Sequence, residues 1–407
     1  MSATTPIPSH VPQDRVFYFD IYRDSRVTED VQGSYADALK NAPDIFYTPA
    51  NGGHWVVRRL KDMREVLTDA GHFSSREATI PRVKNPPFII PFNLDQPENI
   101  PYRSALLPWF SAKAIQSLEV KLHYWAKQFV EDVADKGECD FIADVSARFP
   151  VSVFMEFMEM PYERLQEFRS IVDDYFRCIT SEDYERVTGK IRGIMSALIE
   201  LRTSEPGKDL VTHLLAAQIN GRPISKDEVL AMCHLLFLGG MDTVTNVLGF
   251  TYQYLAQDVP LQVRLRDDPA SIPKFVDEAV RCFGTANSVR IVRRDCKRFD
   301  IDFLEGDMVL SALPISGRDD RENKDPDRFD IDRQGNVRSN VTFSSGAHLC
   351  LGHILARAEI RVLTEEWVKR IPSFSAKSGV RHGFRIGLVH AIESLPLRWD
   401  VVSLPQE

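Results

Sequence analysis

The sequence lacks the marks of secretion, of membrane insertion and of a disulfide scaffold. Its first residues are polar and interrupted by prolines at positions 6, 8 and 12, without the charged-then-apolar plan of a signal peptide. No run of about 20 apolar residues occurs, as a membrane-spanning helix would need. Six cysteines in 407 residues form no C-x-x-C pair, which is typical of reduced thiols. We therefore expect a cytoplasmic protein outside the membrane.

Two further absences narrow the function. No G-x-G-x-x-G stretch opens a helix, so the chain has no sequence mark of its own flavin or nicotinamide site. The net charge of −8 argues against nucleic acid as a partner. What is present is a globular composition, 43% apolar and 27% charged. Length alone suggests two or three domains, but no linker or repeat divides the chain, so we expect a single domain over residues 1–407.

One cysteine stands in an unusual setting. Residues 343–352 read FSSGAHLCLG, directly before a helical stretch. A thiolate at the start of a helix meets unpaired backbone N–H groups and the positive end of the helix dipole, so Cys350 is well placed to carry negative charge. Gly346 and Gly352 allow backbone to pass close to a large flat ligand, and Phe343 can shield the sulfur from water. Alternatives are a buried structural thiol, or zinc bound by Cys350 with His348, which lacks the usual paired ligands.

The stretch resembles the cysteine loop of the cytochrome P450 haem-thiolate monooxygenases, with Ser344 where the family has its first glycine. The resemblance implies that Cys350 is the proximal ligand of the iron of haem b. It also implies a mainly α fold with small β-sheets, the triangular helical prism of this family. The camphor-hydroxylase branch is the most similar, through residues 236–244 and 394–400.

Upstream segments agree with this resemblance. Glu278 and Arg281 lie three residues apart in a segment whose apolar residues recur at helical spacing. Their side chains should therefore lie on the same face of a helix. On their own they would be an ordinary surface pair. The resemblance implies that Arg328, in the sequence PDRF, joins them in a buried structural cluster beneath the cofactor.

A second segment with chemical character lies in a long predicted helix. Ser225 and Glu228 form a capping box, and the apolar run continues without proline as far as Pro260. Gly239 and Gly240 inside this helix cost roughly 0.8–1.0 kcal/mol each relative to alanine, and close approach of a ligand would explain them.

The residues after the two glycines can open the helix. Thr243 can donate its hydroxyl to the carbonyl of Gly239, and Asp242 places a carboxyl beside it. The resemblance implies an oxygen-binding groove at the glycines, with Asp242 and Thr243 delivering protons; the alternative is a kink with a surface Asp. Arg169 and Arg177 are candidate partners of Asp242 or ordinary surface arginines.

Haem carries two propionates that need donors if they are partly buried. Positions that match the family pattern are Arg103, Arg290 and His348. Asn99 stands where many relatives have His, and we expect it to make a weaker contact.

By the same resemblance, the substrate pocket lies between the irregular segment 79–97, the long helix, the segment after Glu278 and a late turn. Its expected lining is almost wholly apolar: Phe88, Ile89, Phe92, Leu235, Leu238, Gly239, Thr243, Ala286, Ser288, Leu388 and Val389. Camphor hydroxylases hold the ketone with a loop tyrosine, but Pro87 aligns there and residues 79–97 contain no Tyr. We therefore expect a small hydrophobic terpenoid or norisoprenoid, such as an ionone-like ketone, in place of camphor. Segment 79–97 and helices around 169–201 are expected to move on binding.

The resemblance also implies an external source of electrons. We expect a [2Fe-2S] ferredoxin with a separate ferredoxin reductase, docking near Arg103, Lys113, Arg357 and Arg361, and a monomeric enzyme. Two other functions share the cysteine loop: a peroxide-driven haem peroxygenase and a haem-based sensor. The peroxygenase has less need of Asp242 and Thr243, and the sensor would carry a signalling module that the sequence does not contain.

Overall fold

The computed structural model describes residues 4–77, 79–84, 86, 88–178, 180–335 and 339–401, so Pro87 lies outside the described residues. The α-helices are α1 (Val31–Leu39), α2 (Leu60–Thr68), α3 (Ile100–Leu106), α4 (Ala112–Ala134), α5 (Phe149–Phe157), α6 (Leu165–Arg177), α7 (Ser181–Ser204), α8 (Leu210–Leu215), α9 (Lys226–Met241), α10 (Thr243–Leu255), α11 (Val259–Asp267), α12 (Ile272–Cys282) and α13 (His353–Arg370).

The strands are short. They are β1 (Ile45–Thr48), β2 (His54–Val57), β3 (Phe73–Ser74), β4 (Glu138–Asp140), β5 (Gln218–Ile219), β6 (Arg222–Pro223), β7 (Ser288–Val292), β8 (Cys296–Arg298), β9 (Ile301–Phe303), β10 (Met308–Ser311), β11 (Ser375–Ala376), β12 (Phe384–Arg385), β13 (Ala391–Ile392) and β14 (Pro396–Arg398). The largest sheet has the order β1-β2-β10-β7-β3, antiparallel except where β10 runs parallel to β2.

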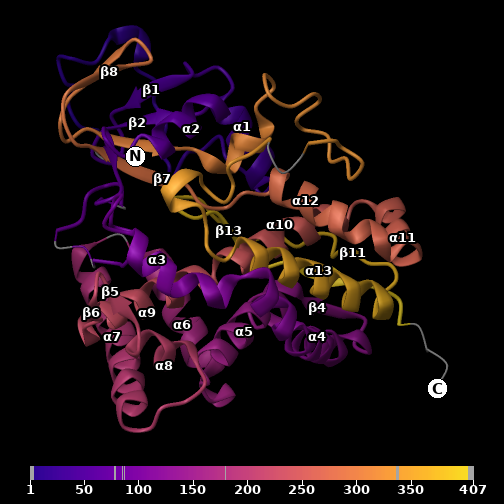
Figure 1. Cartoon of the computed structure of the whole chain (residues 1–407). Helices are drawn as coiled ribbons and strands as arrows, with labels where there is room; N and C mark the ends of the chain where they lie inside the picture. The colour runs from indigo at the N-terminus through magenta and orange to yellow at the C-terminus, as the bar shows by residue number, and fades with distance from the viewer. Residues whose placement is uncertain are drawn as a thin grey trace.

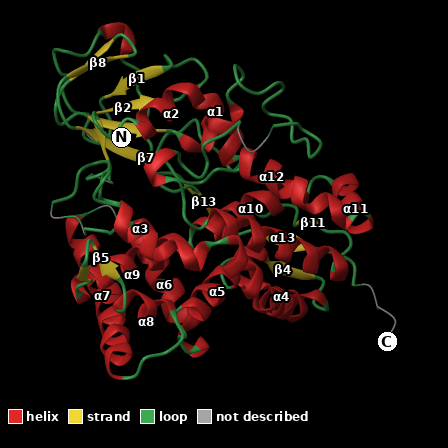
Figure 2. Ribbon diagram, viewed as in Figure 1, coloured by secondary structure: helices red, strands yellow, loops and turns green. Residues whose placement is uncertain are grey.

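Sheet and helices occupy different parts of the molecule (Figures 1 and 2). The sheet of β1, β2 and β7 lies with α1 and α2 on one side, and helices α3 and α5–α9 gather on another. Strands β1, β2 and β10 are buried along their whole length, which explains why they are apolar at nearly every position. These three strands are thus covered on both faces, whereas Ser288 and Ile291 of β7 are partly buried.

The hydrophobic core consists of two clusters. The larger joins the sheet to α4, α10, α12 and α13, and the smaller joins residues 89–106 to α5–α9. α9 packs into the smaller cluster with Met232, Phe237 and Met241, whereas α10 packs into the larger one with Leu248 and Phe250. The two halves of the long helical segment therefore belong to different cores.

The predicted long helix is present but interrupted. The capping box is confirmed, because Ser225 accepts from the N–H of Glu228 and the Glu228 carboxylate accepts from the N–H of Ser225. The expectation of one continuous helix is wrong at Asp242, where α9 ends and α10 begins. Residues 226–255 are long and apolar enough to cross a membrane by length and composition alone, yet 56% of their most apolar window is buried inside the protein. Helices α9 and α10 therefore lie in the core of the protein.

Candidate haem-thiolate site

The cysteine loop holds its sulfur in an internal space. Cys350 donates its N–H to the carbonyl of Phe343 at 2.9 Å, and α13 begins three residues later. The side chain of Cys350 is accessible to solvent, yet protein atoms surround it on all sides. The sulfur therefore borders a space inside the molecule. Burial raises the pKa of the Cys350 thiol, while the N–H of Gly352 and the charges of Arg103 and Arg357 oppose that rise. The surroundings thus contain the donors that a thiolate ligand needs.

The loop backbone explains why the family pattern asks for glycine. Gly346 has φ +64°, and a Cβ there would lie 2.9 Å from Cγ2 of Thr68. Ser344 stands at the position of the missing glycine and is forced to φ +65°, a conformation that L-residues rarely adopt. Its hydroxyl is buried without a hydrogen-bond partner. The departure from the family pattern therefore stores strain in the loop.

Zinc is not supported as the metal. Within the ranges that the structure describes, no group of three or more His, Cys, Asp or Glu side chains could hold a metal ion. His348 does not approach Cys350 as a second ligand, because its Nε2 contacts Oγ of Ser75 at 3.0 Å. Cys350 is thus the single protein ligand expected of a haem-thiolate iron.

The predicted propionate contacts converge on one region. Arg103 of α3 donates to the carbonyl of Leu349 at 2.6 Å, and Arg290 of β7 donates to Oγ of Ser288 at 2.9 Å. Both arginine charges act on His348, which places the three side chains close together. Neither Arg103 nor Arg290 forms an ion pair with a carboxylate of the described chain. A buried and a partly buried guanidinium group, neither in an ion pair, suit the two negative groups of haem.

The pKa shifts in this region have the same origin. Burial lowers the pKa of Arg290 to about 10, and it lowers the pKa of Arg103 as well. Burial, assisted by Arg290 and Arg103, lowers the pKa of His348 to about 4, so the imidazole is neutral near pH 7. Asn99 donates to the carbonyl of Ala347 at 3.4 Å, while its Oδ1 is buried without a partner. The residues therefore fit an anionic cofactor, with Asn99 as a neutral member.

The break between α9 and α10 has the predicted local chemistry. The hydroxyl of Thr243 donates to the carbonyl of Gly239 at 3.1 Å, which confirms the expected back-bond. Gly239 is exposed in the middle of a core segment, and a Cβ placed on it would meet nothing within 4 Å. The helix thus presents bare backbone to open space, as a ligand groove requires.

Asp242 has partners other than those expected. It is 5% exposed and accepts a hydrogen bond from Asn246 at 2.8 Å, while Arg385 of β12 lies 3.9 Å from its Oδ2. Neither arginine suggested by the sequence pairs with Asp242. Arg169 donates to the carbonyl of Ala143, and Arg177 is a surface arginine that pairs with Glu393, as the alternative expected. Burial raises the pKa of Asp242 to about 6, an effect that Arg385 partly offsets. An acid with this pKa can exchange a proton near neutral pH.

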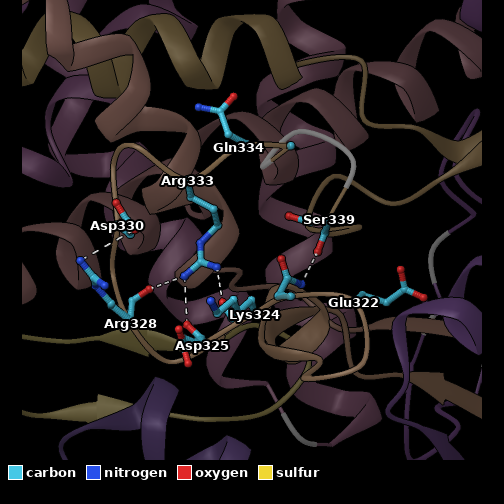
Figure 3. Close-up of a pocket in the computed structure, with 10 residues that line it drawn as sticks. Glu322, Lys324, Asp325, Arg328, Asp330, Arg333, Gln334 and Ser339 are labelled. Atoms are coloured by element: carbon cyan, nitrogen blue, oxygen red, sulfur yellow. Dashed lines mark hydrogen bonds and ion pairs between the residues drawn. The ribbon is translucent and has the colours of Figure 1, made fainter.

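The charged cluster around Glu278 and Arg281 differs from the expectation in one member. Arg281 and Glu278 form a fully buried ion pair at 2.7 Å, as expected. The side chain of Arg328 is 71% exposed and points toward Asp330, so its expected place in the cluster is wrong. Arg333 takes that place, 3.3 Å from Glu278. Its guanidinium is held there by the carbonyls of residues 324, 325 and 328 (Figure 3). Arg328 contributes its backbone carbonyl, which accepts from Arg281 at 3.0 Å.

The expected substrate residues fall into three groups. Ile89 and Leu238 are buried in the smaller core cluster, and Leu235 packs against it. Ala286 and Val389 form an isolated β-bridge, next to Ser288 at the start of β7 and to Leu388 in the late turn. Phe88 is half exposed, at 50%, and Phe92 lies with its ring 6.5 Å from that of His348.

The cations expected to receive a redox protein are partly neutralised. Arg357 pairs with Asp277 at 3.1 Å, and Arg361 pairs with Glu365 and with Glu119. They border a groove of about 320 Å³ between α4, α12 and α13. The face therefore carries both charge signs around an apolar floor.

Sequence reasoning missed Arg333, Arg385 and Asn246. Asn246 lies four residues after Asp242, the spacing at which helical side chains meet, and that signal was available. Arg333 lies five residues after Arg328 in an irregular segment, where spacing predicts no contact. Arg385 reaches Asp242 only through the tertiary fold.

Comparison with known proteins agrees with this geometry. The model of the cytochrome P450 family matches residues 271–371. "Probable cytochrome P450 127A1" of Sinorhizobium fredii is 31% identical over 409 residues, covering 97% of both chains. The chain belongs to the cytochrome P450 family. Its cofactor is haem b, and the chain is a P450 oxidoreductase of the monooxygenase type.

Solved P450 structures have the same fold. The crystal structure of CYP101J2 is 34% identical, with a TM-score of 0.90 over 98% of this chain and all of the other. CYP101C1 is 30% identical, also with a TM-score of 0.90, over 97% of this chain and all of the other. These two confirm both the mainly α P450 fold and the camphor-hydroxylase-like branch. Among the relatives, linalool 8-monooxygenase of Pseudomonas putida is 27% identical over 410 residues, covering 95% of this chain and 99% of the other.

Proposed function

We propose that this P450 hydroxylates a small hydrophobic terpenoid or norisoprenoid, such as an ionone-like ketone, with O₂ and two electrons from a [2Fe-2S] ferredoxin. A separate ferredoxin reductase would supply electrons to the ferredoxin. We propose that the enzyme acts in the cytoplasm as a monomer with one domain over residues 1–407. The observation that carries the monooxygenase chemistry is the opened helix, where Thr243 bonds to Gly239 beside the buried Asp242.

Each set of residues has a task in this proposal. When bound, haem supplies oxygen activation and C–H oxidation, for which a thiolate ligand is suited. Cys350 holds the iron, and Arg103, Arg290 and His348 hold the propionates. Thr243 and Asp242 hold and pass protons at Oγ1 and at the carboxylate. The apolar side chains around them exclude water, which favours directed proton delivery.

The apolar character of the expected pocket residues supports the proposed substrate class. Ile89, Leu235, Leu238 and Val389 offer dispersion contacts and no hydrogen bond from their side chains. A relative over nearly the full chain is named for oxidation of linalool, a small terpenoid. Without a loop tyrosine, a ketone such as camphor loses a bond worth about 0.5–1.5 kcal/mol and, with it, its orientation.

A ligand titration tests the substrate proposal. β-Ionone and camphor are added to the haem-loaded protein, and displacement of iron-bound water is followed as the change in spin state in the absorption spectrum. We expect β-ionone to give the larger shift and the tighter binding. Binding of camphor far more tightly than β-ionone would overturn the proposed class.

The mixed face around the groove of α4, α12 and α13 supports docking of an acidic partner. Arg357 and Arg361 lie on its rim, and Ile115, Val276 and Ile354 are among the apolar residues that line it. Charged rims raise the rate of encounter, and apolar floors supply the affinity. If peroxide alone supported turnover as well as the ferredoxin system does, a peroxygenase would replace this proposal.

A further inference from the structure

Arg385 contacts three separate segments of the chain. Its Nη1 donates to the carbonyl of Phe176 at 3.2 Å and to that of Val389 at 3.3 Å. Its Nη2 lies 3.9 Å from Oδ2 of Asp242. The side chain is 19% exposed and its Nε is buried without a hydrogen-bond partner. One guanidinium thus connects the end of α6, the late turn and the acid at the helix break.

The two carbonyl contacts come from parts of the chain that border the expected substrate. Val389 forms the bridge with Ala286, and both belong to the expected wall of the pocket. Phe176 is the next-to-last residue of α6, and its ring lies 5.6 Å from the guanidinium of Arg385. A ligand that presses on the turn or on α6 would therefore move the acceptors that hold Arg385.

Two other side chains, Asp173 and Asn246, act on the carboxylate of Asp242. Asp173 of α6 acts against ionisation of Asp242, and Asn246 of α10 stabilises its carboxylate. Asp173 in turn faces Arg169, Arg177 and Glu393, and the charge of Arg385 acts on it as well. Among the described residues, Arg385 is the one cation within 4 Å of the Asp242 carboxylate. A polar surface pocket of about 390 Å³ is lined in part by Asp173, so this group of charges reaches solvent there.

We propose that Arg385 is a positioning residue that holds Asp242 in its proton-donating place and links it to the substrate wall through the carbonyls of Phe176 and Val389. The inference rests on the proposed function of Asp242 and deepens it. Substrate fixes the two carbonyls, the carbonyls fix the guanidinium, and the guanidinium fixes the carboxylate. Access of protons to the oxygen site then depends on whether the pocket is filled.

The test compares Arg385→Gln and Arg385→Lys with a control, Arg177→Gln, in the haem-loaded enzyme. Arg177 is the matched control because it is an arginine of the same region whose ion pair is with Glu393. Infrared spectroscopy follows the protonated carboxyl of Asp242 as pH changes, its band being the one that Asp242→Asn removes. The second measurement is product formed per electron pair against pH, with β-ionone as substrate.

Loss of the opposite charge should raise the titration midpoint of Asp242 by about 1 pH unit or more in Arg385→Gln. Arg385→Lys keeps the charge but has one nitrogen in place of the two that separately bind the carbonyls and face Asp242. Its midpoint should therefore stay near that of the native protein, while addition of β-ionone no longer shifts it. Arg177→Gln should shift the midpoint less than Arg385→Gln does, because Arg177 acts on Asp242 only through Asp173. An unchanged midpoint in Arg385→Gln, or a larger shift in Arg177→Gln, would overturn the inference.

The design separates this inference from the proposed function. If Asp242→Asn leaves the yield of product per electron pair unchanged, the proton relay fails, whatever Arg385 does. If Asp242→Asn lowers that yield and neither Arg385 variant does, the relay stands and the role of Arg385 fails. The infrared midpoint of the ligand-free protein does not depend on the substrate, so a wrong choice of substrate leaves that result decisive.

Discussion

At the scale of single residues, Ser344 shows the cost of departing from the family pattern. Its left-handed backbone and its buried, unpartnered hydroxyl are both unfavourable, and glycine would remove both. The greater freedom of glycine in the unfolded chain offsets part of the gain. We expect Ser344→Gly to stabilise the haem-loaded protein by about 0.5–1 kcal/mol, measured by urea unfolding.

Gly346→Ala is the matched control, with the opposite sign expected. The added Cβ would meet Thr68 at 2.9 Å in a left-handed conformation, so this variant should be less stable. Destabilisation by Ser344→Gly would contradict the account of strain in the loop.

Thr243 carries the clearest functional prediction at this scale. Thr243→Ala removes the hydroxyl that holds the carbonyl of Gly239 beside open space. We expect electron consumption to continue while hydroxylated product falls and hydrogen peroxide rises, measured as the ratio of peroxide to product. Thr251→Ala is the control, because Thr251 is back-bonded to Val247 in the same way but lies two turns further along α10. Equal ratios in the two variants would remove Thr243 from the relay.

At the scale of elements, the break between α9 and α10 has a measurable dependence on pH. The pKa of Asp242 is about 6 in the folded protein and its ordinary value is 3.8. The folded state therefore binds the proton more tightly, and the stability that protonation provides is lost as pH rises through 6. Relative to Asp242→Asn, the free energy of unfolding of the native protein should fall by about 1.4 kcal/mol between pH 5 and pH 8. A difference that does not vary with pH would show that Asp242 does not titrate in this range.

The buried pair of α12 gives a prediction with a sharp internal comparison. Glu278→Gln leaves the fully buried Arg281 without its counter-ion and should cost about 3–5 kcal/mol. Arg333→Ala removes a guanidinium that binds Glu278 and three carbonyls, and should cost about 1–3 kcal/mol. Arg328→Ala should lie within about 0.5 kcal/mol of the native protein, because its side chain is exposed. Urea unfolding followed through the haem absorbance measures all three, and a larger cost for Arg328 than for Arg333 would reverse their assignment.

These elements also show how far the sequence alone could lead. The cap of α9, the back-bond of Thr243 and the pair of Glu278 with Arg281 depend on residues three or four positions apart, a distance at which helical geometry decides the contact. The family resemblance supplied Cys350, which no periodicity distinguishes from a buried thiol. Arg385 and Arg333 could not be foreseen, because their partners are fixed by loops and a hairpin that fold back from elsewhere in the chain. The end of α9 at Asp242 depends on packing against two separate cores.

At the scale of the whole molecule, the net negative charge contrasts with the mixed face around the α4–α12–α13 groove. Asp277→Asn would release Arg357 from its ion pair and make this face more positive. We expect faster reduction of the enzyme by an acidic ferredoxin at low salt, with a steeper loss of rate as salt is added. Stopped-flow mixing with the reduced ferredoxin measures both rates.

Lys113→Glu is the companion variant and should slow the same step, while its activity with peroxide stays unchanged. If neither variant alters the rate of reduction, the ferredoxin docks elsewhere.

The meeting of two cores at a helix break has a practical consequence. Phe343 and Ile354, on either side of Cys350 in the sequence, pack against the larger cluster. Helices α6 and α7 belong to the smaller cluster, against which Leu351 of the cysteine loop also packs. The residues around the iron ligand therefore pack mainly against the larger cluster, and the helices through which a ligand would enter pack in the smaller one. We therefore expect that substitutions in α6 and α7 can enlarge the entrance and favour bulkier substrates while haem binding is retained.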